Sequence, residues 1–181
     1  MRARTKSQNK AVSKETDMAI SNLKDLYIDQ LQDIYSANRQ SKAVTAKLAG
    51  RATHGELQSA LEDGVSGIEE GIEIVGEIIR GHNADPTGEF CKGMEGLVKE
   101  AKAHALEADI VDKDTLDASI ITQYQRMTHY GIAGYGCCLA FAKRLGLDED
   151  AKKLETCLDN TYGGDRRMTE IAMGEVNKAA A

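Results

Sequence analysis

Apolar residues recur at helical spacing over four long stretches of this 181-residue chain, and short breaks group the stretches into two pairs. Side chains at i, i+3, i+4 and i+7 share one face of an α-helix, so each stretch predicts an amphipathic helix. The predicted helices run over about 22–48, 55–80, 112–144 and 147–177. A weaker pattern over 88–108 predicts one or two short helices between the pairs. The sequence therefore predicts an all-α, ferritin-like four-helix bundle, built from two antiparallel hairpins joined by a crossover.

The breaks in the pattern contain residues that commonly end or begin helices. Gly50 and Gly146 follow the first and third helical stretches, where glycine ends helices readily. For the third helix, Asp114 or Thr115 is the expected N-terminal cap. One proline, two phenylalanines and no tryptophan agree with a helical core packed on aliphatic side chains.

Charge separates the beginning of the chain from the rest. Residues 1–17 hold five Lys or Arg against two acids, so we expect residues 1–20 to form a basic, disordered tail and residues 21–178 to form the bundle. The net charge of −6 argues against nucleic-acid binding except through this tail. No apolar run is long enough to cross a bilayer, and the four cysteines lack metal-ligand spacing. We therefore expect a cytoplasmic protein with reduced thiols, and no membrane partner.

Three glycines interrupt the third helical stretch at YQRMTHYGIAGYGCC, residues 124–138. Gly131, Gly134 and Gly136 each cost about 1 kcal/mol relative to alanine inside a helix. Something must compensate for this cost: close helix packing, a cavity, or the remains of a site that once held larger side chains.

Small residues are expected to meet at one height of the bundle. Residues equally far from a hairpin turn lie at about the same level, which places Asn38 beside Gly64 and Gly67, and Gly131 beside Gly164. These positions continue the apolar stripes of their helices and therefore face inward. Each long helix brings a glycine or a small polar residue toward the bundle centre.

Three blocks of the sequence resemble the bacterial YciE/YciF-type ferritin-like family, a rubrerythrin-related group associated with stress. The blocks are LKDLYIDQLQDIYSANRQ (23–40), CKGMEGLVKEAKAH (91–104) and ITQYQRMTHYGIAGYGCCLAFAKRLGLDEDAKKLE (121–155). The resemblance spans about residues 20–175. It implies a homodimeric bundle, and for typical members it suggests a di-iron or di-manganese centre.

Departures from the family pattern fall in the middle layer. Asn38 stands where a glutamate is usual, and Gly64 and Gly67 lie among the carboxylate positions of the second helix. The third-helix block keeps His129 and Tyr130 but loses both acids. No Glu-x-x-His pair occurs anywhere in the chain, although such pairs supply ligands in ferritin-like metal sites. We therefore expect no metal ligands and no cofactor.

The remaining polar groups of this layer are the candidate site. His129, Tyr130 and Tyr124 are candidate catalytic residues, with a histidine bonded at the bundle flank and packed tyrosines as the structural alternatives. Glu70 falls on the polar side of its helix and is not counted. The candidate ligand-binding residues are Asn38, Gly64, Gly67, Gly131, Gly164 and Tyr162. Because protein interiors avoid large voids, we expect a collapsed centre, with a small-molecule pocket as the alternative.

Three functions fit this pattern. The first is a metal-free, stress-associated ferritin-like dimer that acts through association. The second is a metal-independent protein, a binder or an enzyme, that takes a small molecule at the glycine-lined centre. The third is a di-iron or di-manganese ferroxidase or peroxidase, which requires ligands that the sequence does not supply.

Overall fold

The computed structural model describes residues 20–176, 178 and 180, and confirms the all-α class. Its helices are α1 (Leu23–Arg51), α2 (Gly55–Gly81), α3 (Lys92–Ala101), α4 (Lys113–Leu145) and α5 (Asp148–Ile171). Single π-helical turns follow α3 at Lys102–Leu106 and α5 at Ala172–Val176. The expected basic tail lies outside the described residues except for Ile20, which is exposed.

Side-chain caps begin helices α1 and α4, and a glycine ends α4. Asn22 accepts a hydrogen bond from the Asp25 backbone N–H at the start of α1. At α4 the expected cap was wrong: Asp112 is the cap, because its Oδ1 accepts the Thr115 N–H at 2.7 Å. Gly146 ends α4 in the left-handed conformation, with φ of 69°, which a residue with a Cβ adopts only under strain.

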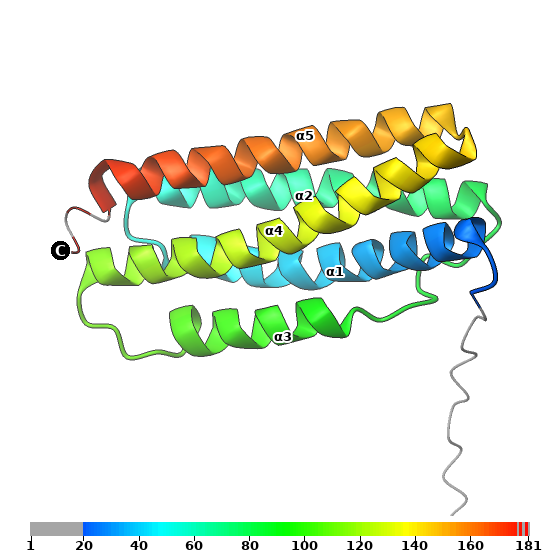
Figure 1. The fold of residues 1–181 in the computed structure, drawn as a ribbon. Coiled ribbons are helices and arrows are strands. Elements are labelled where there is room, and N and C mark those ends of the chain that lie inside the picture. Colours follow the sequence, from blue (N-terminus) through cyan, green and yellow to red (C-terminus); the bar gives the residue numbers. More distant parts are fainter. Residues whose placement is uncertain (1–19, 177, 179, 181) are drawn as a thin grey trace, which may run out of the picture.

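Two antiparallel hairpins form the bundle, as the sequence predicts. In Figure 1, α1 pairs with α2 and α4 pairs with α5, while α2 also lies beside α5 and α1 beside α4. The helices α2 and α4 are therefore diagonal neighbours across the core. The crossover helix α3 packs along α1 and α4. Fully buried aliphatic and thioether side chains from the long helices fill the ends of the bundle, among them Leu31, Leu57, Leu61, Ile120, Leu154 and Met168.

Partly buried polar contacts connect the helices at both ends of the bundle. At one end, Asp117 of α4 accepts hydrogen bonds from the backbone N–H groups of Thr53 and His54 and from the Thr53 hydroxyl, at 2.7–2.8 Å. At the other end, Asp150 of α5 accepts from the Tyr27 hydroxyl at 3.0 Å and lies 2.6 Å from His82 Nε2. These contacts fix the hairpins against each other, and so they fix the height at which the central residues meet.

No helix within the described residues is long and apolar enough to cross a membrane.

Candidate functional site

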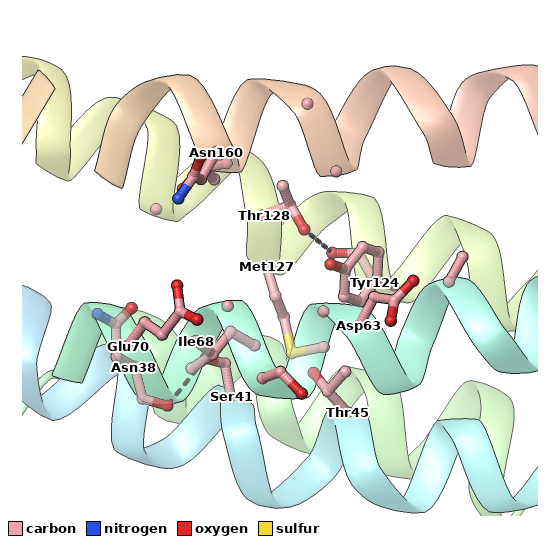
Figure 2. A pocket seen from close by; sticks show the side chains of 18 of the residues that line it. Asn38, Ser41, Thr45, Asp63, Ile68, Glu70, Tyr124, Met127, Thr128 and Asn160 are labelled. Carbon is pink, nitrogen blue, oxygen red and sulfur yellow. Dashed lines mark hydrogen bonds between the residues drawn. The ribbon is translucent and has the colours of Figure 1, made fainter. Parts of the chain in front are cut away.

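A cavity of about 490 Å³ lies between the four long helices, at the layer where the sequence predicts small residues to meet. Figure 2 shows its polar lining: Asn38, Ser41 and Thr45 of α1 lie opposite Asn160 of α5. The expectation of a collapsed centre was wrong. The reason is that long side chains at both ends of the layer hold the helices apart while small ones line the space between them.

Two tyrosines of α4 cross the bundle diagonally and bound the cavity. The hydroxyl of Tyr124 lies against Gly64 of α2, and the hydroxyl of Tyr135 lies against Gly71. A Cβ on either glycine would collide with the phenol oxygen, so these glycines are required for close approach. At about 1.5 Å per residue, the two tyrosines stand about 16 Å apart along α4, with Gly131 between them.

The α1 side forms a polar floor. Asn38 Nδ2 donates to the Tyr135 hydroxyl at 2.7 Å, and the Ser41 hydroxyl donates to the Asn38 carbonyl at 3.1 Å. Thr45 is fully buried, and its Oγ1 has no hydrogen-bond partner among the described residues. An unpaired buried hydroxyl costs about 1–3 kcal/mol, so Thr45 marks a place where a polar atom of another molecule would be stabilising.

The mouth opens between α2 and α5 and carries the charged groups of the site. Asp63 and Glu70 come from α2, and Asp159 and Arg167 come from α5. Arg167 Nη1 lies 2.6 Å from Asp63 Oδ2 and bridges the two helices across the mouth. The floor is uncharged and the rim is charged, as in many small-molecule sites.

Burial keeps the two cavity phenols neutral, and also the thiol of Cys157, which neighbours Tyr135. It is the largest cause of the raised pKa of both Tyr124 and Tyr135. Burial also raises the pKa of Cys157 to about 11. These groups therefore donate and accept hydrogen bonds in their protonated forms at neutral pH, and none of them is suited to act as a base.

The structure brings together most of the residues that the sequence singles out. The predicted residues that line the cavity are Asn38, Gly64, Gly67, Gly131, Gly164 and Tyr124. Of the three glycines in the third helical stretch, Gly131 borders the cavity and Gly134 lies directly against Ile34. Gly136 has no such contact, and the structure offers no packing reason for it.

Three predicted residues lie away from the cavity. The His129 side chain is 64% exposed, and its Nε2 lies 3.1 Å from Asp165 Oδ1. Tyr130 points toward α1 and the start of α3 instead: its hydroxyl donates to Asp33 of α1 at 2.8 Å and accepts from the thiol of Cys91, the N-cap of α3. Tyr162 is exposed. Their positions differ from the prediction because neighbouring residues on a helix point about 100° apart, so a shared height does not imply a shared face.

Other lining residues were missed by the sequence argument. Glu70 is exposed, as its polar position predicts, yet it also lines the cavity, because the mouth lies at the flank of α2. Thr45 and Arg167 lie at the inward edge of their helices. Their spacing from Ser41 and from Gly163 or Gly164, by three or four residues, is a signal that could have identified them.

The donors at this layer do not fit a two-metal centre. Among the described residues there is no group of three or more His, Cys, Asp or Glu placed to hold a metal ion. The floor offers an amide, hydroxyls and phenols, and Arg167 places a cation in the wall. Ferritin-like metal sites instead use inward carboxylates and two histidines.

Comparison with known proteins identifies the family. Residues 22–181 match the family described as a domain of unknown function, DUF892. The chain belongs to this family. It is 30% identical to Protein YciF of Escherichia coli (strain K12) over 146 residues, which span 80% of this chain and 87% of YciF.

Solved structures support the same assignment of this DUF892 protein. The crystal structure of the E. coli stress protein YciF matches with a TM-score of 0.82 at 30% identity, covering 88% of this chain and 99% of that one. YcfI from Rhodopseudomonas palustris matches with a TM-score of 0.79 at 31% identity, covering 84% and 96% of the two chains. The protein is therefore a ferritin-like bundle of the YciE/YciF type.

Proposed function

We propose that this DUF892 protein is a metal-free ferritin-like protein whose central cavity binds a small organic molecule. The observation that carries the proposal is the cavity of about 490 Å³, lined by hydrogen-bonding groups that are mostly uncharged. Concave sites between bundle helices are common places for small ligands. Asn38, Tyr135 and Tyr124 orient the ligand, and Gly67, Gly131 and Gly164 leave the space that it occupies.

Binding rather than turnover is the activity that these groups support. Both cavity phenols are held neutral by burial, and His129 lies outside. Neither phenol nor the histidine is therefore placed to accept a proton inside the cavity, and the lining carboxylates Glu70 and Asp159 are exposed at its rim. The ferroxidase and peroxidase alternatives require ligands at Asn38 and at the glycine positions, which those side chains do not supply.

Three features of the biological setting belong to the proposal. Similarity to a stress protein supports a role in stress. A homodimer, expected from the family resemblance, would place two such cavities in one assembly. A cytoplasmic location agrees with reduced cysteines.

Two measurements on the purified full chain test the proposal. The first is elemental analysis after expression with added iron and manganese and without chelators, for which we expect far less than one metal ion per chain. The second is titration with the neutral fluorophore N-phenyl-1-naphthylamine, whose emission rises in apolar surroundings. We expect one bound probe per chain.

Cavity-filling variants make the second measurement specific. The Cβ of a side chain at position 164 would face the Tyr124 hydroxyl at 3.7 Å, so Gly164→Leu fills the centre. Gly67→Phe, at a position without neighbours within 4 Å, blocks the α2 side. Both variants should lose probe binding, whereas Gly96→Leu on exposed α3 should retain it. About two metal ions per chain, or probe binding unaffected by both fillings, would overturn the proposal.

A further inference from the structure

The mouth of the cavity carries an excess of negative charge. The lining contains three carboxylates, Asp63, Glu70 and Asp159, and one guanidinium, that of Arg167. Arg167 is bound to Asp63. Within the described part of the chain, Glu70 and Asp159 have neither a hydrogen bond nor an ion pair, and both are exposed at the rim. Two unneutralised carboxylates on opposite helices therefore flank the entrance.

The carboxylate of Glu70 faces the space between the helices. Figure 2 shows it reaching from α2 toward the side of the cavity where Asn160 of α5 lies. Glu70 also acts on Cys157 of α5: burial is the main cause of the raised pKa of that thiol, and the Glu70 charge raises it further. A ligand entering between α2 and α5 passes this carboxylate.

The deep end of the cavity is uncharged and largely apolar. Met94 and Met127 are almost completely buried there and provide apolar, adaptable contact surfaces. Among them lies the Thr45 hydroxyl, which is without a hydrogen-bond partner in the described residues. The site thus offers an anionic entrance and an apolar deep end that contains one free hydroxyl.

From this order of groups we infer that the ligand is a protonated amine with an apolar body and a polar oxygen at its far end. The ammonium lies at the rim between Glu70 and Asp159, the body contacts Met94 and Met127, and the oxygen bonds to Thr45. An anion would meet two unpaired carboxylates at the entrance, and a neutral molecule would leave them without a partner. The inference rests on the proposed small-molecule cavity.

Three probes of nearly the same shape test the charge preference. Tyramine is the amine, 4-propylphenol is its neutral counterpart, and 3-(4-hydroxyphenyl)propanoate is the anion. Affinities for the full-length protein are measured by isothermal titration calorimetry. We expect tyramine to bind about fivefold or more tightly than 4-propylphenol, and the anion to bind most weakly. Added salt should weaken tyramine binding and leave 4-propylphenol binding nearly unchanged.

Variants assign the preference to named groups. Glu70→Gln and Asp159→Asn should each lower tyramine affinity about threefold to fivefold without changing that of 4-propylphenol. Glu73→Gln, an exposed α2 carboxylate outside the lining, is the matched control and should bind as the unaltered protein does. Thr45→Val should weaken tyramine but not phenethylamine, which lacks the phenolic oxygen.

The outcomes separate this inference from the proposed function. If N-phenyl-1-naphthylamine binds in the cavity but the three phenols show no preference for the amine, the inference fails and the small-molecule cavity stands. If the protein prefers tyramine but Glu70→Gln and Asp159→Asn leave the tyramine affinity unchanged, the assignment of this charge preference to the mouth is overturned. If neither the fluorophore nor any phenol binds, both proposals fail.

Discussion

The amide Nδ2 of Asn38 in α1 donates a 2.7 Å hydrogen bond to the hydroxyl of Tyr135 in α4, and both side chains are buried. The same hydroxyl lies over Gly71 of α2, so one phenol oxygen of α4 contacts both α1 and α2. This contact closes one end of the central cavity. It uses an asparagine at a position where the family resemblance leads one to expect a glutamate.

Removing that oxygen should loosen the bundle. Tyr135→Phe leaves the buried Asn38 amide without its acceptor, so we expect the free energy of unfolding to fall by about 1–2 kcal/mol. Urea denaturation measures the change, and the exposed Tyr162→Phe should change it by less than about 0.5 kcal/mol. In the Tyr135→Phe background, Asn38→Leu should cost less than it does alone. Equal costs in both backgrounds would show that the two residues are not coupled.

The glycines in the middle of α4 should respond oppositely to alanine. A Cβ at Gly134 would collide with the buried side chain of Ile34, so Gly134→Ala should destabilise by about 1–3 kcal/mol. A Cβ at Gly136 would meet nothing within 4 Å, so Gly136→Ala should stabilise by about 0.5–1 kcal/mol through helix propensity. Thermal unfolding of both variants checks the contrast. Changes of the same sign would contradict the packing described here.

Asp117 should be a major stabilising residue of the α1–α2 turn. It is fully buried and accepts three hydrogen bonds from Thr53 and His54. An amide cannot accept all three, so Asp117→Asn should lower the free energy of unfolding by about 2–3 kcal/mol. Denaturant unfolding measures the loss, with the exposed Asp109→Asn as control. A loss no larger than that of the control would show that the turn does not depend on this carboxylate.

Stability should fall as the solution becomes alkaline. Burial raises the pKa of Cys157 to about 11 and that of Cys138 to about 12, from an ordinary 9.0. Near and above that ordinary value the unfolded chain releases these protons while the folded chain keeps them. Their contribution is therefore complete below about pH 8 and is lost as pH rises, by up to about 1.4 kcal/mol per pH unit for each thiol.

Denaturant midpoints between about pH 8 and pH 10 test the slope. Cys138→Ala and Cys157→Ala should each flatten it, whatever they do to stability at neutral pH. Cys137→Ala, at an exposed cysteine, should flatten it less, because the Cys137 charge is a smaller cause than burial of the raised pKa of Cys138. The range stops near pH 10 because burial also raises the pKa of Tyr124 and Tyr135, which then titrate in the unfolded chain. A flat profile in the unaltered protein would contradict the burial of the two thiols.

Much of the site could be anticipated from spacing alone. Equal distances from the turns correctly brought Asn38, Gly64, Gly131 and Gly164 to one cavity. The argument failed for His129, Tyr130 and Tyr162, which share that height but lie on other faces. Helical periodicity shows which side of a helix is apolar. How many of the residues beside that apolar stripe are also covered depends on the distance to the neighbouring helix, and that distance is set by all the side chains in the interface.

The sequence by itself determined the four long helices, the crossover, the layer of small residues and the absence of any Glu-x-x-His pair. These follow from local propensity, from periodicity and from the residue types present. Only the tertiary structure decided that the centre stays open. Tyr124 and Tyr135 reach diagonally to Gly64 and Gly71 and hold the helices apart, so the small residues between them cannot close the gap. That outcome depends on contacts between residues far apart in the chain, which no local pattern encodes.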